Sequence, residues 1–127
     1  MNKEELKNRT KKFAVRVFTF LKTLPQGKDV EVVSYQLFKS SSSVAANYRA
    51  VCRSKSYSDF SNKLKIVNEE ADESLFWLEF IEELKLQYDK NELNELKTEA
   101  NELVSIFTAA IKTIIEKQNG AEKIVNH

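Results

Sequence analysis

Residues 57–84, YSDFSNKLKIVNEEADESLFWLEFIEEL, repeat apolar or small residues at alternating steps of three and four. This spacing places them on one face of an α-helix, and it is typical of a seam that packs against other helices. The seam residues are Tyr57, Phe60, Leu64, Val67, Ala71, Ser74, Leu78 and Ile81. A second stripe lies about 120° around the helix and contains Ile66, Glu70, Glu73, Trp77, Phe80 and Leu84. A helix with two stripes needs two neighbours, which predicts a helical bundle.

Turn and capping residues divide the rest of the chain into further helices. The only proline and one of the two glycines, Pro25 and Gly27, mark the first connection, with Asp29 as the expected N-cap. Two pairs have capping-box spacing, Ser56 with Asp59 and Asp89 with Glu92. Asn119-Gly120 is typical of a helix C-terminus. We therefore predict an all-α domain over residues 1–118 with helices at about 3–23, 29–54, 57–87 and 90–118, followed by a flexible tail at 119–127.

The run of four serines at 40–43 interrupts the second predicted helix. Serine propensity alone permits a loop here. The apolar residues on both sides keep one helical register, however, and small side chains let neighbouring helices approach closely, so we favour a helix. In an antiparallel hairpin with the next helix, Lys39 would lie level with Asp72, and the serine hydroxyls could donate to Glu70 or Glu73.

Composition excludes several classes of protein. The chain has 127 residues, 31% charged and 42% hydrophobic, which favours one folded domain. A single cysteine, Cys52, and a single histidine, His127, leave no disulfide and no zinc site. The charged N-terminus and the lack of a long apolar run predict a cytoplasmic protein without a membrane span.

The sequence contains no catalytic signature. The densest carboxylate group is Glu69, Glu70, Asp72 and Glu73, but the Glu-x-x-His pairs of helical di-metal sites are missing. These acids are better explained as solvated or paired, and Cys52 as a packed thiol rather than a nucleophile. We predict a protein that is not an enzyme and has no cofactor or metal.

Charge is divided unevenly along the chain. Residues 1–65 carry 14 Lys/Arg and 5 Asp/Glu, a net +9, and residues 66–127 carry 6 and 14, a net −8, which sums to the +1 of the whole chain. Such a division can hold basic helices against acidic ones, steer subunits together, or create a basic face for nucleic acid.

Two sets of residues are candidates for contacts with partners. The first is basic, with Tyr48 and Tyr57 interleaved, and suits phosphate contacts and base stacking: Lys39, Arg49, Arg53, Lys55, Lys63 and Lys65. Arg49 and Arg53 could equally pair with acids of a neighbouring subunit. The second set is expected at a helix or subunit interface: Arg9, Lys12, Arg16, Glu70, Glu73, Phe76, Trp77 and Phe80.

Several motifs resemble one known family. They are Y-Q-L-F-K-S at 35–40, V-A-A-N-Y-R-A at 44–50, R-S-K-S at 53–56, E-E-A-D-E at 69–73 and F-W-L-E at 76–79. Over about residues 9–117 the chain resembles bacterial four-helix-bundle proteins named after the intervening sequences of 23S ribosomal RNA genes. The resemblance implies an up-and-down antiparallel bundle, a helical serine run and a homopentameric ring.

The resemblance also bears on function. Related accessory proteins of diversity-generating retroelements use a similar pentamer to bind a reverse transcriptase and nucleic acid, but they are strongly basic and this chain is almost neutral. For most members of the family no biochemical activity is established. Two hypotheses follow: a self-assembling accessory protein that binds RNA or DNA, or a protein-interaction scaffold whose basic residues are used in its own interfaces.

Overall fold

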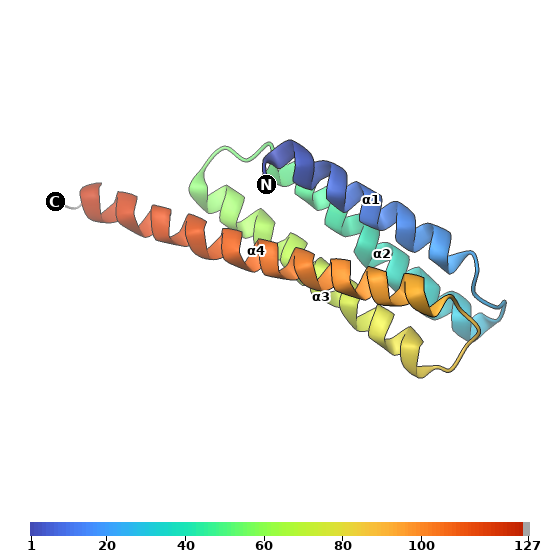
Figure 1. The fold of residues 1–127 in the computed structure, drawn as a ribbon. Coiled ribbons are helices and arrows are strands. Elements are labelled where there is room, and N and C mark those ends of the chain that lie inside the picture. Colours follow the sequence, from blue (N-terminus) through green and yellow to red (C-terminus); the bar gives the residue numbers. More distant parts are fainter. Residues whose placement is uncertain (126–127) are drawn as a thin grey trace.

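The computed structural model describes residues 1–125, with side chains described through Gly120, as a bundle of four helices. They are α1 (Lys3–Leu21), α2 (Lys28–Val51), α3 (Tyr57–Glu83) and α4 (Lys90–Val125). Consecutive helices run in opposite directions, and the described residues include no strand (Figure 1). The prediction of an all-α, up-and-down four-helix bundle is confirmed.

The core lies on the common axis of the four helices. α1 packs on α2, α2 on α3, α3 on α4 and α4 on α1. The backbones of the diagonal pairs stay farther apart, with no Cα atoms within 8 Å, although the rings of Tyr48 on α2 and Phe107 on α4 meet across the core. The predicted seam of α3 is buried from Leu64 to Ile81, whereas Tyr57 at its start is exposed and Phe60 is half-buried. The largest fully buried side chains come from all four helices: Phe13, Leu37, Leu64, Leu78, Ile81, Leu93, Leu96, Leu103 and Phe107.

Side-chain caps fix the start of two predicted helices. The Ser56 hydroxyl accepts a hydrogen bond from the Asp59 N–H at 3.0 Å, and Asp89 accepts one from the Glu92 N–H at 3.1 Å. The predicted cap at Asp29 is wrong, because α2 begins one residue earlier with Gly27 as its N-cap and no side-chain bond. Gly27 has φ 156°, and a Cβ there would lie 2.8 Å from the Asp29 carboxylate, so this connection needs glycine.

The C-terminal ends of the helices differ from the predicted ends. α3 stops at Glu83 rather than near 87, because Lys85 takes a left-handed conformation with φ 56°. α4 passes through Asn119-Gly120 and continues to Val125, beyond the end of the other helices (Figure 1). One glycine inside a helix costs only about 1 kcal/mol, and good helix formers follow it. The predicted flexible tail is therefore helical up to Val125, and its last two residues lie outside the described part.

The serine run at 40–43 lies within α2, so the prediction of a helix there is confirmed. Ser40 and Ser41 are buried, and their hydroxyls donate to the carbonyl oxygens of Leu37 and Phe38 at 3.1 and 3.2 Å. The Ser40 hydroxyl also lies 3.0 Å from that of Ser74 on α3. The expected bonds to the Glu70 and Glu73 carboxylates do not form, because the hydroxyls bond to carbonyls of their own helix and to Ser74.

Candidate interaction surfaces

Two arginines connect α1 to the acidic side of α4. Arg9 forms a bidentate pair with Glu99 at 2.6 and 2.7 Å and also contacts Glu102. Hydrogen bonding to Glu99 raises the pKa of Arg9 despite partial desolvation. Two turns further along α1, Arg16 pairs with Glu92 at 2.6 Å and Glu95 at 3.0 Å. These ion pairs show that some basic residues of the first half of the chain pair with acidic residues of the second half within one molecule.

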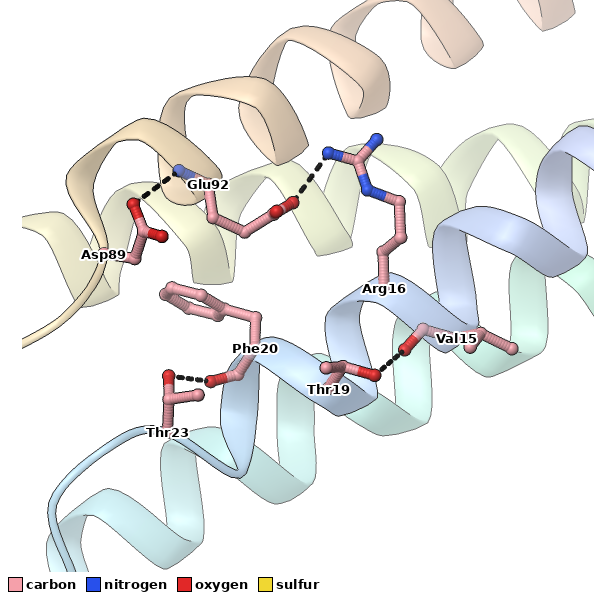
Figure 2. A pocket seen from close by; sticks show the side chains of 7 residues that line it. All are labelled: Val15, Arg16, Thr19, Phe20, Thr23, Asp89 and Glu92. Carbon is pink, nitrogen blue, oxygen red and sulfur yellow. Dashed lines mark hydrogen bonds and ion pairs between the residues drawn. The ribbon is translucent and has the colours of Figure 1, made fainter.

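A hollow of 270 Å³ lies beside this connection, between α1 and the start of α4 (Figure 2). Its polar groups already bond to one another or to the backbone: Arg16 to Glu92, Asp89 to the Glu92 N–H, Thr19 to the Val15 carbonyl and Thr23 to the Phe20 carbonyl. It therefore offers few free groups for holding a ligand.

The third basic residue predicted at an α1 interface, Lys12, is exposed and forms no ion pair with residues 1–120.

Two clusters of aromatic rings remain exposed on the bundle. The first, the α1–α2 cluster, consists of Phe18, Tyr35 and Phe38, with the two phenylalanine rings 5.2 Å apart. These three line an open groove of 410 Å³ together with Leu21, Leu24, Pro25 and Val30. Tyr35 is 62% exposed. Aromatic surface of this kind is typical of contacts with another protein.

The second, the α3 cluster, consists of Phe76, Trp77 and Phe80. Its ring centroids lie 4.9 to 6.1 Å apart, and Phe76 is 54% exposed. Ile66 and Leu84 extend the exposed apolar stripe along α3. The first seam of α3 is covered by neighbouring helices, whereas this second stripe is left largely uncovered within the chain.

Acidic side chains flank the α3 cluster. Glu69, Asp72, Glu73 and Glu79 are exposed and form no ion pair with the described side chains. Glu70 is half-buried, and burial raises the pKa of its carboxyl, with Glu73 adding to the effect and Lys39 opposing it. A cation placed over this face would stabilise the charged form of Glu70.

Most of the predicted nucleic-acid contacts are exposed and free of ion pairs with residues 1–120, namely Lys39, Arg49, Arg53, Lys55 and Lys65. Lys63 instead pairs with Asp59 at 3.1 Å. Tyr57 is 48% exposed and accessible for stacking. The expectation that Tyr48 stacks on bases is wrong, because its ring is buried, and burial raises its pKa to about 12 with a smaller contribution from Cys52.

Arg49 belongs to a basic groove between α1 and α2. The groove has a volume of 400 Å³ and is lined by Lys7, Asn8, Lys11, Ala45, Ala46 and Arg49. Sequence reasoning missed Lys7 and Lys11. Their spacing of four residues, on a helix antiparallel to the one that carries Arg49, is the signal that could have found them.

The comparison with protein families decides which group this bundle represents. The model of the 23S rRNA-intervening sequence protein family matches residues 2–109. The chain belongs to this family. The chain is also similar to a solved structure from Bacteroides thetaiotaomicron, described as a protein of unknown function from the S23 ribosomal protein family. The two are 28% identical with a TM-score of 0.78, covering 88% of this chain and 99% of the other. No curated protein matches the chain.

The family match and the similar solved structure give this chain a family and a fold but no established function. The family match ends at residue 109, whereas α4 continues to Val125. No catalytic family is indicated, and residues 1–120 contain no group of three or more His, Cys, Asp or Glu side chains able to hold a metal ion. None of the helices in the described part combines the length and apolar character of a membrane span. Cys52 is half-buried at the edge of the core, and His127 lies outside the described residues.

Proposed function

We propose that this protein is a non-enzymatic, self-assembling subunit of a cytoplasmic ring. The observation that carries the proposal is the pair of exposed aromatic clusters on different helices. A head-to-tail contact joins two different patches of one subunit type, and it closes into a ring when the rotation between successive copies completes a circle. The α1–α2 cluster of one copy is placed against the α3 cluster of the next, and five copies is the number that the family resemblance implies.

Charge supports the same contact. The exposed cations of α2 lie in the basic half of the chain, and unpaired acids flank the α3 cluster. Contact between copies would bring these opposite charges together, and a cation brought near Glu70 would lower its raised pKa and stabilise its charged form. Because exposed charges are screened by salt, the assembly should weaken as ionic strength rises.

Two substitutions at exposed positions test the contact. Tyr35→Glu damages the α1–α2 cluster and Phe76→Glu the α3 cluster, so each variant alone should be monomeric by sedimentation velocity. A mixture of the two should form a one-to-one pair, because each retains the patch that the other lacks. Ala109→Glu, at an exposed site on α4, is the control and should assemble like the parent protein.

Two outcomes would contradict this proposal. A parent protein that is monomeric at micromolar concentration in low salt would exclude the ring. Assembly of the parent with no pair in the mixture would show that the contact joins identical patches rather than different ones.

A second candidate function is association with RNA or DNA. The observation in its favour is that Arg49, Arg53 and Lys55 are exposed and unpaired, and that Arg49 also lines the basic groove with Lys7 and Lys11. Cations in a groove can follow a phosphate backbone; Lys7 also pairs with Glu4 at 3.5 Å, whereas Lys11 and Arg49 form no ion pair with residues 1–120. In the pure scaffold alternative, these cations would be used at subunit contacts.

Fluorescence anisotropy with a labelled structured RNA and a matched DNA, at several salt concentrations, separates the two alternatives. Binding should be saturable and weaken steeply with salt, and the double substitution Arg49→Gln with Arg53→Gln should lower the salt slope by about 2. Lys28→Gln, exposed near the start of α2, is the control and should change the binding little. Absence of binding at low salt would assign the protein to the scaffold class.

A further inference from the structure

The end of the bundle at which α1 begins contains a larger cavity than the grooves described above. It has a volume of 690 Å³ and lies where α1 begins, where the chain passes from α2 to α3, and beside Ile114 and Lys117 of α4. Figure 1 shows these segments at the end from which α4 projects. The lining residues are Lys3, Ser54, Lys55, Ser56, Tyr57, Phe60, Ile114 and Lys117.

The cavity carries an excess of positive charge. Lys3, Lys55 and Lys117 line it, and none of them forms an ion pair with residues 1–120. The nearby acid, Asp59, already accepts hydrogen bonds from the Lys63 ammonium at 3.1 Å and the Lys55 N–H at 3.3 Å. Both bonds lower the pKa of the Asp59 carboxyl, and the bond from Lys63 has the larger effect. Three lysines therefore remain available for an anion.

Aromatic and polar groups accompany the lysines. Tyr57 presents an exposed ring to the cavity, and Phe60 lies half-buried with the Lys3 ammonium 5.7 Å from its ring centroid. The Ser54 hydroxyl oxygen is buried and has no hydrogen-bond partner among the described residues. A buried hydroxyl without a partner is uncommon, and an ordered water or a ligand atom can supply the missing bond.

Phosphate-binding cations beside an exposed ring are the combination that recognises a nucleotide. We propose that this cavity binds a nucleotide, with its phosphate among Lys3, Lys55 and Lys117 and its base against the Tyr57 ring. The cavity volume lies within the usual range of small-ligand pockets. Ile114 and Lys117 lie beyond the family match at 2–109, so this wall of the cavity belongs to the additional part of α4.

The nucleotide can come from two sources that share this chemistry: a free mononucleotide, or one nucleotide of a single strand. Only the second source rests on the nucleic-acid function proposed above. Nuclear magnetic resonance titration of the full-length protein with adenosine monophosphate, adenosine and inorganic phosphate tests the site directly. Amide shifts should concentrate around residues 54–60, and the monophosphate should bind about tenfold more tightly than adenosine or phosphate.

Variants assign the roles of individual residues. Tyr57→Ala should weaken monophosphate binding about tenfold, and Tyr57→Trp should restore it because a ring is again present to stack. Lys117→Gln should weaken binding severalfold, whereas Lys112→Gln, an exposed lysine of α4 that does not line the cavity, should not. Circular dichroism establishes that each variant keeps its helices.

A labelled ten-nucleotide thymidine strand distinguishes the sources. If Tyr57→Ala weakens binding of the strand as well as the monophosphate, the site takes a nucleotide of a strand; if only the monophosphate is affected, the ligand is a free nucleotide. No saturable shift around residues 54–60 at millimolar monophosphate, together with strand binding insensitive to Tyr57, would overturn the cavity proposal. RNA binding that still depends on Arg49 and Arg53 would leave the broader function standing.

Discussion

Replacing Phe107 by alanine should destabilise the bundle by about 3–5 kcal/mol. Phe107 has no exposed surface, and its ring packs 5.9 Å from that of Tyr48, so the substitution opens a cavity between α2 and α4 that solvent does not fill. Native proteins are stable by only about 5–15 kcal/mol, and the variant should therefore unfold at a much lower urea concentration. The measurement is urea denaturation followed by circular dichroism.

Phe76→Ala is the matched control, since it removes the same atoms from a ring that is 54% exposed. Both substitutions should be made in the Tyr35→Glu background, where assembly does not contribute to the free energy of unfolding. Phe76→Ala should then cost about 1 kcal/mol or less. Equal losses at the two sites would mean that Phe107 is not the core residue that its burial indicates.

Helical periodicity predicted the number and positions of the helices, because burial of one face dominates their stability. Helix ends were less predictable, since they depend on single residues. Lys85 ends α3 by adopting a left-handed conformation that nothing in its sequence neighbourhood requires, and Gly120 does not end α4. Caps made by an adjacent side chain, as at Ser56 and Asp89, were recovered because capping pairs are local in sequence.

The interaction surfaces were predictable only where they follow one helix. The stripe containing Trp77 and Phe80 was visible from spacing within α3. Tyr48 was interpreted as a stacking residue, whereas its burial shows that it belongs to the core. The pairing of Arg9 with Glu99 joins residues far apart in the chain, so no local pattern identifies the partner. The end cavity likewise combines residues from both ends of the sequence.

Ser74→Leu should be the most damaging substitution on the α2–α3 interface. Ser74 has no exposed surface and lies opposite Ser40, in a layer of small residues that lets the two helices approach closely. Leucine adds volume where the surrounding side chains leave none, so we expect a loss of about 3 kcal/mol and a fall in Tm of about 10 °C. Ser105→Leu, at an exposed site on α4, is the control and should change Tm little.

A second substitution at the same position separates volume from hydrogen bonding. Ser74→Ala removes the hydroxyl and its bonds to Ser40 and to the Glu70 carbonyl without adding atoms. Ser40 keeps its bond to the Leu37 carbonyl, so no buried donor is left without a partner and the cost should be about 1 kcal/mol or less. If Ser74→Ala proved as harmful as Ser74→Leu, the hydroxyl network, rather than the close approach of α2 and α3, would be what specifies this layer.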